Sequence, residues 1–335
     1  MKMLRNFAVA AVALLSMTGV AAAQAPVTLA IGGAACLCYL PTVLTAQLGN
    51  FKKAGVDVKL VDFKGGSQSL MAVIGGSADV VSGYYDHTVE LAAKDQYLTA
   101  FVTYDQFPGL VLVVAPGQTG KIKSVKDLKG KKVGVSAPGS STDFFLKFQL
   151  AKAGLPTNAA AVIGVGLGGT AVAAMEQGSI DAAVMLDPAV TILKAKYNNL
   201  DILTDTRSRK DTRAVFGGDY PGGAFYAKAE WLKSHPKEAQ AMTNAVVNTL
   251  HWIHSHTAEQ IMEKMPPALV GHDKALYVAA LKNTLPMYST TGRMDPKGAE
   301  AVLKVFQAGS PAVAKAKIDL SRTYTNAFVD KAPKQ

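Results

Sequence analysis

Two glycine-rich loops that end in a hydroxyl side chain are the clearest places for ligand chemistry in this sequence. Gly65-Gly66-Ser67 and Gly168-Gly169-Thr170 each precede an apolar stretch, and Pro138–Thr142 (PGSST) has a similar composition. A helix that starts in such a loop presents free N–H groups and a partial positive charge. Ser and Thr hydroxyls add further hydrogen bonds. These loops therefore predict recognition of a small anionic or polar group.

Catalytic and cofactor motifs are weak or missing. Gly164–Gly169 has the glycine spacing of a dinucleotide-binding loop, but only about eight residues separate Thr170 from Gly178, too few for a full crossover helix. No Gly-x-Ser-x-Gly elbow occurs, and Gly120-Lys121 lacks the Ser or Thr of a phosphate-binding loop. The histidines within residues 251–256 have no further ligand at suitable spacing and are interpreted as solvated. We predict no enzyme activity, no cofactor and no metal site.

The Gly-Gly-hydroxyl loops belong to a longer repeat. Residues 65–81 read GGSQSLMAVIGGSADVV, and residues 168–184 read GGTAVAAMEQGSIDAAV. Each copy follows a strand, a loop, a helix ending in Ala-Gly and a second strand, beginning at Val27–Ile31 and at Lys132–Ser136. Strands that alternate with helices predict parallel βαβ units, so two copies predict two similar α/β lobes.

Three kinds of residue recur at matching positions of the repeat, and each has a local structural reason. The hydroxyl residue is expected to cap the N-terminus of a helix. The later glycine is expected to end that helix in the left-handed conformation. The aspartate is expected to open a strand and to play a structural part. The three pairs are Ser67 and Thr170, Gly76 and Gly178, and Asp79 and Asp181.

The remaining segments predict how the lobes are joined. Residues 216–232 contain a return strand, and the chain after them reads as helical. We expect a first lobe from residues 26–115 plus 213–330, and a second lobe from residues 116–212. The chain then crosses twice between the lobes, which is typical of a hinge that closes on a ligand.

The N-terminus and the charge predict the compartment. Residues 1–25 combine Lys2 and Arg5 with an apolar run, Phe7–Val20, and small residues around Ala23, which is typical of a secretory signal peptide. We expect cleavage after Ala23 and a soluble periplasmic product, because the run is too short for a membrane anchor. Loss of the two basic residues lowers the net charge from +10 to +8. This positive charge favours anionic solutes or an anionic surface, and the scattered positions of the lysines argue against nucleic acid.

Cys36 and Cys38 are the two cysteines of the sequence. We expect the side chains to point apart in an extended segment, so that a disulfide between them would be strained. The prediction is therefore two small, mostly buried thiols. A metal pair stays open as an alternative, but it needs further ligands that the sequence does not place.

Four stretches carry a resemblance to a known family. They are LPTVLTAQLGNFKKAGVDVKLVDFKGGSQSLMAVIGGSADVV, SVKDLKGKKVGVSAPGSST, GSIDAAVMLDPAV and FYAKAEWLKSHPKEAQAM. In order and spacing they resemble periplasmic substrate-binding proteins of ABC transporters, within the nitrate/sulfonate/taurine and thiamine-pyrimidine-precursor group. The resemblance implies a type II two-lobed α/β fold with two hinge crossings. It also implies one small ligand between the lobes and delivery to an ABC permease in the inner membrane. We expect the protein to be a monomer.

The predicted site combines this resemblance with the geometry of α/β sheets, in which ligands bind beyond the carboxyl ends of the strands. The resemblance assigns ligand contacts to residues 36–39, 65–67, 83–85 and 138–142. Each hydroxyl is equally consistent with a helix cap, and each tyrosine with core packing. His87 is interpreted as structural. The predicted ligand-binding residues are Cys36, Leu37, Cys38, Tyr39, Gly65, Gly66, Ser67, Gly83, Tyr84, Tyr85, Pro138, Gly139, Ser140, Ser141, Thr142, Thr170, Asp187 and Tyr220.

Three functions stay open at this stage. The first is a periplasmic receptor for a small anionic solute of the sulfonate, nitrate or carboxylate class. The second is an enzyme of the thiamine-pyrimidine synthase type on the same fold, which the secretory signal disfavours. The third is a ligand-sensing module that acts on a membrane receptor. A screen for stabilising solutes separates the first from the second.

Overall fold

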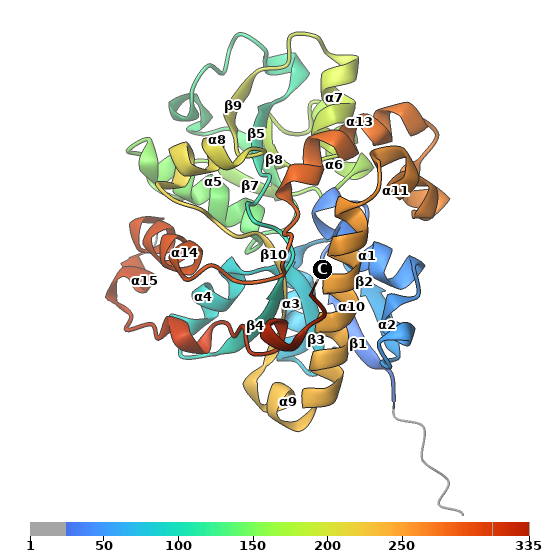
Figure 1. Cartoon of the computed structure of the whole chain (residues 1–335). Coiled ribbons are helices and arrows are strands. Elements are labelled where there is room, and N and C mark those ends of the chain that lie inside the picture. Colours follow the sequence, from blue (N-terminus) through green and yellow to red (C-terminus); the bar gives the residue numbers. More distant parts are fainter. Residues whose placement is uncertain (1–24, 310, 335) are drawn as a thin grey trace, which may run out of the picture.

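The computed structural model describes residues 25–309 and 311–334 of the chain. It contains two five-stranded sheets, each flanked by helices, which form two lobes stacked along the long axis of the molecule (Figure 1). The predicted two-lobed α/β fold is therefore confirmed. The predicted signal peptide, residues 1–23, lies outside the described residues.

The first sheet has the strand order β2-β1-β3-β10-β4. Strand β1 pairs in parallel with β2 and β3, while β10 runs antiparallel between β3 and β4. Leu29 of β1 lies opposite both Leu60 and Val80, so apolar side chains continue across the sheet. The strands are β1 (Val27–Ile31), β2 (Val58–Asp62), β3 (Val80–Tyr84), β4 (Leu98–Thr103) and β10 (Gly223–Lys228).

The second sheet repeats this plan, with the strand order β7-β6-β8-β5-β9. Strand β6 pairs in parallel with β7 and β8, and β5 runs antiparallel between β8 and β9. The strands are β5 (Val111–Val114), β6 (Lys132–Val135), β7 (Ala161–Gly164), β8 (Ala182–Met185) and β9 (Ile202–Asp205). The antiparallel strand of each sheet, β10 or β5, thus follows directly after a segment in which the chain crosses from the other lobe.

The predicted lobe boundaries stay a prediction, but the sheets revise one assignment. The boundary at residue 115 would leave β5 in the first lobe, whereas β5 hydrogen-bonds only within the second sheet among the described strands. The chain therefore crosses between the sheets at residues 104–110, and it returns at residues 206–222. A pattern of apolar residues predicts a strand, but it does not say which sheet the strand joins.

The repeated aspartates hold the start of each lobe together. The backbone N–H of Thr28 in β1 donates to Asp79 Oδ2 at 2.8 Å, and the N–H of Lys132 in β6 donates to Asp181 Oδ2 at 2.8 Å. Each aspartate thus joins the third strand of its repeat to the first. The structural interpretation of both residues is confirmed, and this shared bond explains why the chain contains the same Gly-Ser-x-Asp segment twice.

The predicted helix caps at Ser67 and Thr170 are wrong. Helix α3 (Gly66–Ile74) begins after Gly65, and helix α6 (Gly169–Glu176) begins after Gly168. Gly168 has φ +68°, a conformation that favours glycine, so the chain enters the helix earlier than the hydroxyl pattern indicates. The Thr170 hydroxyl instead donates to the carbonyl of Leu167 at 3.2 Å.

The C-terminal helices pack on both lobes. Helix α10 lies against α1 and α2 of the first lobe, whereas α13 contacts α7 and α14 contacts α5 of the second (Figure 1). The other helices are α1 (Leu40–Gln47), α2 (Asn50–Lys53), α4 (Asp86–Ala92), α5 (Ser141–Lys152), α7 (Ala189–Lys196), α8 (Arg209–Phe216), α9 (Ala229–Ser234), α10 (Pro236–His254), α11 (Ala258–Lys264), α12 (Pro267–Val270), α13 (Lys274–Thr284), α14 (Pro296–Gly309) and α15 (Pro311–Lys315).

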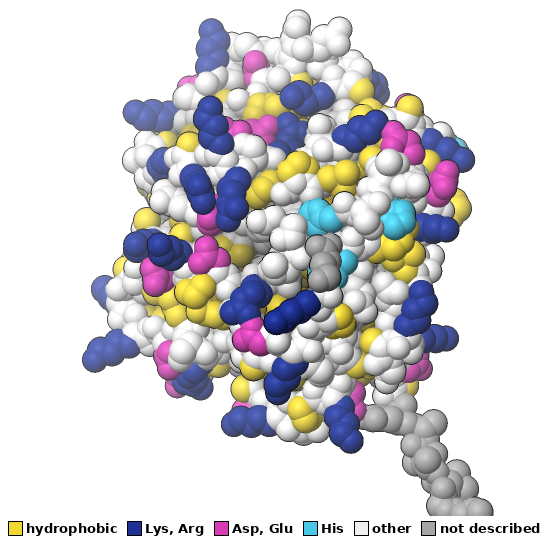
Figure 2. All heavy atoms as spheres, viewed as in Figure 1, with side chains coloured by type: hydrophobic (Ala, Val, Ile, Leu, Met, Phe, Trp, Pro, Cys, Tyr) yellow, Lys and Arg dark blue, Asp and Glu magenta, His cyan; other side chains and the backbone are white. Residues whose placement is uncertain are grey.

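The surface carries its charge without a concentrated basic patch on the face drawn in Figure 2. Lys and Arg side chains there are spread over both lobes, with Asp and Glu between them. No helix within residues 25–309 and 311–334 is long and apolar enough to cross a bilayer.

Candidate functional site

The strand-end loops of the two lobes touch one another. A Cβ placed on Gly65 would lie 3.0 Å from the Cβ of Ala137 and 3.3 Å from the carbonyl carbon of Ser136. The Cβ of Ser67 would lie 3.8 Å from a Cβ placed on Gly139. The structure therefore brings together two of the predicted site loops, residues 65–67 and 138–142, in a closed arrangement of the lobes.

A buried carboxyl group links the lobes at this junction. The Ser141 hydroxyl, at the start of α5, donates to Asp86 Oδ1 at 2.7 Å. The Tyr220 hydroxyl, in the returning crossing segment, donates to Asp86 Oδ2 at 3.1 Å. Burial raises the pKa of Asp86 to about 7, although these two hydrogen bonds act in the opposite direction. Asp86 is therefore protonated in a large fraction of the molecules at neutral pH.

His87 lies beside this carboxyl group with one ring nitrogen unpaired. Its Nδ1 shares a hydrogen bond with the Tyr226 hydroxyl at 3.0 Å, while Nε2 is buried and has no hydrogen-bond partner of good geometry. Burial lowers the pKa of His87 to about 4, with a smaller opposite effect from the backbone of Gly139, so the ring is neutral. A buried polar atom without a partner is costly. Nε2 is therefore a candidate ligand contact.

The glycine of α3 allows the imidazole to approach. A Cβ on Gly66 would lie 2.9 Å from His87 Cε1 and 3.8 Å from the Tyr39 hydroxyl oxygen. The His87 ring also packs edge-on against Phe144 of the second lobe, with ring centroids 5.7 Å apart. Gly66, Tyr39 and His87 thus form one side of the junction. We use the name polar centre for Asp86, His87, Ser141 and Tyr220.

The tyrosines after β3 point elsewhere. The Tyr84 hydroxyl donates to the carbonyl of Pro108 at 2.6 Å, and the Tyr85 hydroxyl shares a hydrogen bond with Thr323 Oγ1 at 2.6 Å. Both side chains are buried in the core. Gly83 allows the Tyr226 hydroxyl to approach, since a Cβ there would lie 2.5 Å from it. The core-packing alternative is therefore favoured for Tyr84 and Tyr85.

The serine-rich loop before α5 satisfies most of its own hydroxyls. The Ser136 hydroxyl donates to Ser140 Oγ at 2.8 Å, and Ser140 and Thr142 share a hydrogen bond of 2.7 Å. The N–H of Gly139 donates to Asp143 Oδ2 at 2.7 Å, and Pro138 packs at Gly164. Ser141, by contrast, reaches across to the other lobe. The loop therefore serves to hold Ser141 in place.

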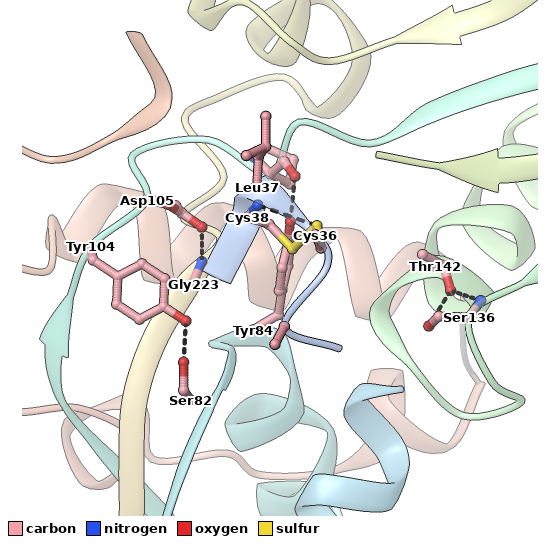
Figure 3. The surroundings of a disulfide bond; sticks show 12 residues. Cys36, Leu37, Cys38, Ser82, Tyr84, Tyr104, Asp105, Ser136, Thr142 and Gly223 are labelled. Carbon is pink, nitrogen blue, oxygen red and sulfur yellow. Dashed lines mark hydrogen bonds between the residues drawn. A yellow bond between two sulfur atoms is a disulfide. The ribbon is translucent and has the colours of Figure 1, made fainter. Parts of the chain in front are cut away.

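The cysteines form a disulfide rather than two thiols, so that prediction is wrong (Figure 3). A short 3₁₀ turn, Leu37–Tyr39, begins directly after Cys36, and it places the two Cα atoms 5.2 Å apart, within the usual range. Residues two apart in an extended segment would in any case share a face, contrary to the premise of the prediction. The disulfide also removes both sulfurs as metal ligands.

The disulfide loop is attached to both lobes. The N–H of Leu37 donates to the carbonyl of Asp187 in the second lobe at 2.9 Å. The Tyr288 hydroxyl donates to the carbonyl of Leu37 at 2.8 Å. Leu37, Cys36 and Cys38 are all buried. The loop thus belongs to the closed junction, and it stays a predicted ligand contact.

Replacing both cysteines by serine is expected to lower the free energy of unfolding by about 1–2 kcal/mol, because a disulfide across three residues closes only a small loop. Urea unfolding with and without a thiol reductant measures this difference. Reductant should shift the midpoint of the wild-type protein and leave the Cys36→Ser/Cys38→Ser variant unchanged. An equal midpoint for the oxidised and reduced wild type contradicts a stabilising disulfide.

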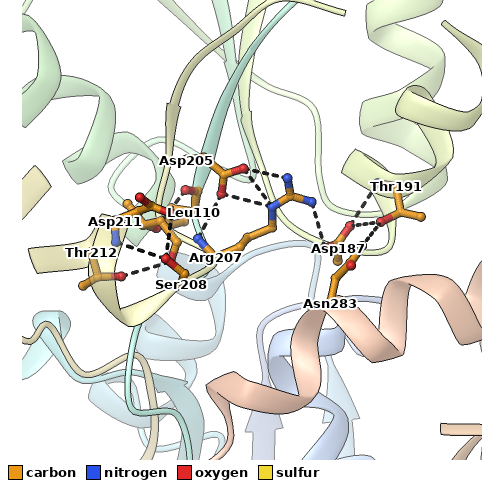
Figure 4. A network of polar contacts seen from close by, with 10 residues as sticks. Leu110, Asp187, Thr191, Asp205, Arg207, Ser208, Asp211, Thr212 and Asn283 are labelled. Atoms are coloured by element: carbon orange, nitrogen blue, oxygen red, sulfur yellow. Dashed lines mark hydrogen bonds and ion pairs between the residues drawn. The ribbon is translucent and has the colours of Figure 1, made fainter. Parts of the chain in front are cut away.

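The Asp187 side chain belongs to a separate network in the second lobe (Figure 4). Its Oδ1 accepts from the Thr191 N–H at 2.9 Å and hydroxyl at 2.7 Å, and its Oδ2 accepts from Arg207 at 3.2 Å. Arg207 also forms a 2.6 Å ion pair with Asp205. Asn283 of α13 donates to Thr191 Oγ1 at 3.2 Å and ties this helix to the network. These bonds favour the structural alternative for Asp187.

The junction includes residues that sequence reasoning missed. Asp86 is not among the predicted site residues, and the sequence favours a structural role for His87, yet both lie directly after the predicted loop at the end of β3. Two adjacent ionisable residues just after the carboxyl end of a strand are the sequence feature that could have indicated this part of the site. Thr170 is exposed and lies outside the polar centre. Within the described residues, no cluster of three or more His, Cys, Asp or Glu side chains could hold a metal ion.

Comparisons with known proteins place this geometry in a family. A solved structure from Bordetella bronchiseptica RB50 is 39% identical, with 92% of this chain and 96% of that chain covered and a TM-score of 0.88. The alkanesulfonate-binding protein SsuA from Xanthomonas axonopodis pv. citri, bound to MOPS, is 19% identical, with 91% and 100% covered and a TM-score of 0.69. The periplasmic nitrate-binding protein NrtA from Synechocystis PCC 6803 is 14% identical, with 92% and 85% covered and a TM-score of 0.66.

The last two likenesses show the fold, which is that of periplasmic binding proteins, as predicted. A comparison with curated proteins finds no match. The sequence profile of the NMT1/THI5-like family matches residues 39–260, more than half of the chain. The protein therefore belongs to the NMT1/THI5-like family.

Proposed function

We propose that this protein is the periplasmic solute-binding component of an ABC import system, which captures a small anionic organic solute between its lobes and delivers it to a permease. The observation that carries the proposal is the polar centre, because it is assembled from both lobes and buried where they meet. Ser141 comes from the second lobe, and Asp86 and His87 come from the first. A group of this kind forms only when the lobes close.

The polar centre supplies hydrogen-bond donors without a formal positive charge. A protonated Asp86 donates one hydrogen bond. If Tyr226 donates to Nδ1 of His87, the ring proton resides on Nε2, which then also donates. The first turns of α3 and α5 begin at the same junction, at Gly66 and Ser141, and add the partial positive charge of helix N-termini. This set of donors suits an oxyanion such as a sulfonate or carboxylate.

Two connections let the lobes open and close as rigid bodies. Residues 104–110 and 206–222 pass between the sheets, and large changes in their backbone angles would separate the junction while each sheet stays intact. Ligand in the open cleft would then be sealed from water on closure. In this proposal the closed surface, made from both lobes, is what the permease recognises, and no catalytic step is required.

A thermal-unfolding screen tests the proposal. A true ligand at a hundred times its dissociation constant is expected to raise the free energy of unfolding by about 2.7 kcal/mol. The screen includes sulfonates, nitrate, small carboxylates and pyrimidines. Ser141→Trp, whose bulk lies between the lobes, serves as the control and should lose the stabilisation. Turnover of a compound, with no stabiliser in any class, would favour an enzyme instead.

A further inference from the structure

An apolar crevice opens beside the polar centre. Its volume is about 60 Å³, counted as the space open to the centre of a water-sized sphere, and it opens to solvent. Six aromatic side chains supply most of its wall. They are Phe144, Phe145, Phe148, Phe216, Tyr220 and Phe306. So many aromatic rings around an unfilled space are typical of a site for an apolar ligand.

The crevice lies between the two lobes. Its aromatic wall on one side comes from α5 of the second lobe, and on the other side from α14 among the C-terminal helices. The rings of Phe144 and Phe306 pack edge to face across this boundary, with centroids 5.0 Å apart. Lobe opening would therefore widen the crevice, and closure would press its walls onto an occupant.

Two residues join the crevice to the polar centre. The Phe144 ring forms part of the crevice wall, and its ring also packs edge-on against His87 at 5.7 Å. Tyr220 stacks on Phe216 at 4.2 Å in the wall, while its hydroxyl donates to Asp86. The crevice and the polar centre thus lie on either side of these two side chains.

The charge of the crevice decides which end of a ligand it holds. Lys147 is the charged residue among those that line it, and its ammonium group is already paired with Asp143 at 2.8 Å. The crevice therefore offers no unpaired charge to an ionic group. The donors lie at the polar centre, so an amphipathic solute would place its charged end there and its apolar end in the crevice.

We propose that this crevice is the subsite for the apolar body of the solute, an alkyl chain or a phenyl ring attached to a monoanionic head group. This inference rests on the proposed function and narrows it. Alkyl and aryl sulfonates or carboxylates would satisfy both spaces at once. Nitrate and other small inorganic anions would leave the crevice empty and bind poorly.

Calorimetric titration of the full mature chain with two homologous series tests the inference. The probes are methane-, butane- and hexanesulfonate, and acetate, butyrate and hexanoate, with nitrate alongside. Affinity is expected to rise about fourfold for each methylene that enters the crevice. Equal affinity for short and long members would support solute capture but overturn the crevice subsite. Tight binding of nitrate or of a pyrimidine, with no binding of either series, would overturn the subsite and leave capture intact.

A larger side chain placed inside the crevice tests the subsite more directly than the two solute series. Val305 of α14 lines it and is buried, so Val305→Phe should lower the affinity for hexanesulfonate at least about tenfold and leave methanesulfonate unchanged. Ala308→Phe, on the exposed side of the same helix, is the matched control and should change neither. A variant that weakens both sulfonates equally contradicts the inference. If Val305→Phe fails to fold, Phe148→Leu at the half-buried mouth should reduce the dependence on chain length.

Discussion

Replacing Gly65 by valine is expected to weaken solute binding about 10- to 100-fold while both lobes keep their fold. A Cβ at Gly65 would already lie 3.0 Å from the Cβ of Ala137 in the opposite lobe, and valine adds two further methyl groups. Overpacking of this kind costs about 1–3 kcal/mol, here paid by the closed form alone. The Gly65 backbone, at φ −175°, is extended and accepts any residue, so the lobe itself is not strained.

Titration with the best stabiliser from the solute screen measures the loss. Gly169→Val is the matched control, because a Cβ on Gly169 would contact nothing within 4 Å. Solution scattering should show the Gly65→Val protein in an open form with and without solute. Wild-type affinity in Gly65→Val would mean that the bound form does not use this contact between Gly65 and Ala137.

Asp86→Asn is expected to remove a pH-dependent cost of folding. The pKa of Asp86 is near 3.8 in the unfolded chain and about 7 in the folded protein, so the folded state binds more protons between these values. This group therefore lowers the free energy of unfolding as pH rises from about 4 to about 7, by up to about 4 kcal/mol. Asparagine does not titrate, so the variant should gain stability relative to wild type across that range.

The test compares the free energies of unfolding of variant and wild type at each pH, because His87 changes stability with pH in the opposite direction to Asp86. Its pKa falls from near 6.5 to about 4 on folding, so its contribution to stability rises with pH over that window. Urea unfolding at pH 4.5, 6 and 8 isolates each group. The free energy of unfolding of His87→Gln should exceed that of the wild type at low pH, and that of Asp86→Asn should exceed it at high pH. A constant difference across pH for Asp86→Asn would place the carboxyl in a hydrated environment instead.

Protonation of Asp86 should also change the affinity for the solute. A protonated Asp86 donates to an anion, whereas the carboxylate repels it. Affinity of the wild-type protein for an anionic solute should therefore fall above pH 7, and the Asp86→Asn protein should show a flat profile. Binding of an uncharged solute should show little of this dependence.

Local patterns predicted the elements of this fold well, since each depends on neighbours in the chain. Val27–Ile31 is a strand with the predicted bounds, and Asp79 and Asp181 have the structural part expected from the repeat. Apolar periodicity and Gly-Ser-x-Asp spacing are properties of short segments, so a single sequence contains them. The predicted N-caps were wrong because glycine conformation, rather than hydroxyl position, decided where the helices begin.

The polar centre could not be predicted in the same way. Asp86 and Ser141 are 55 residues apart and belong to different lobes, so no local pattern links them. The neutral state of His87 comes from burial, to which Phe144 of the other lobe contributes. The disulfide was missed for two reasons. Residues two apart in an extended segment share a face, contrary to the premise of the prediction, and the three-residue turn Leu37–Tyr39 is not shown by composition.

The position of β10 between β3 and β4 also constrains the order of folding. Its partners in the chain precede it by more than a hundred residues, and the entire second sheet lies between them in sequence. The first sheet therefore stays incomplete, with unpaired edges on β3 and β4, until Lys228 has been synthesised. Contacts of such long range are formed slowly, so we expect the second sheet to acquire protection against amide hydrogen exchange earlier than the first.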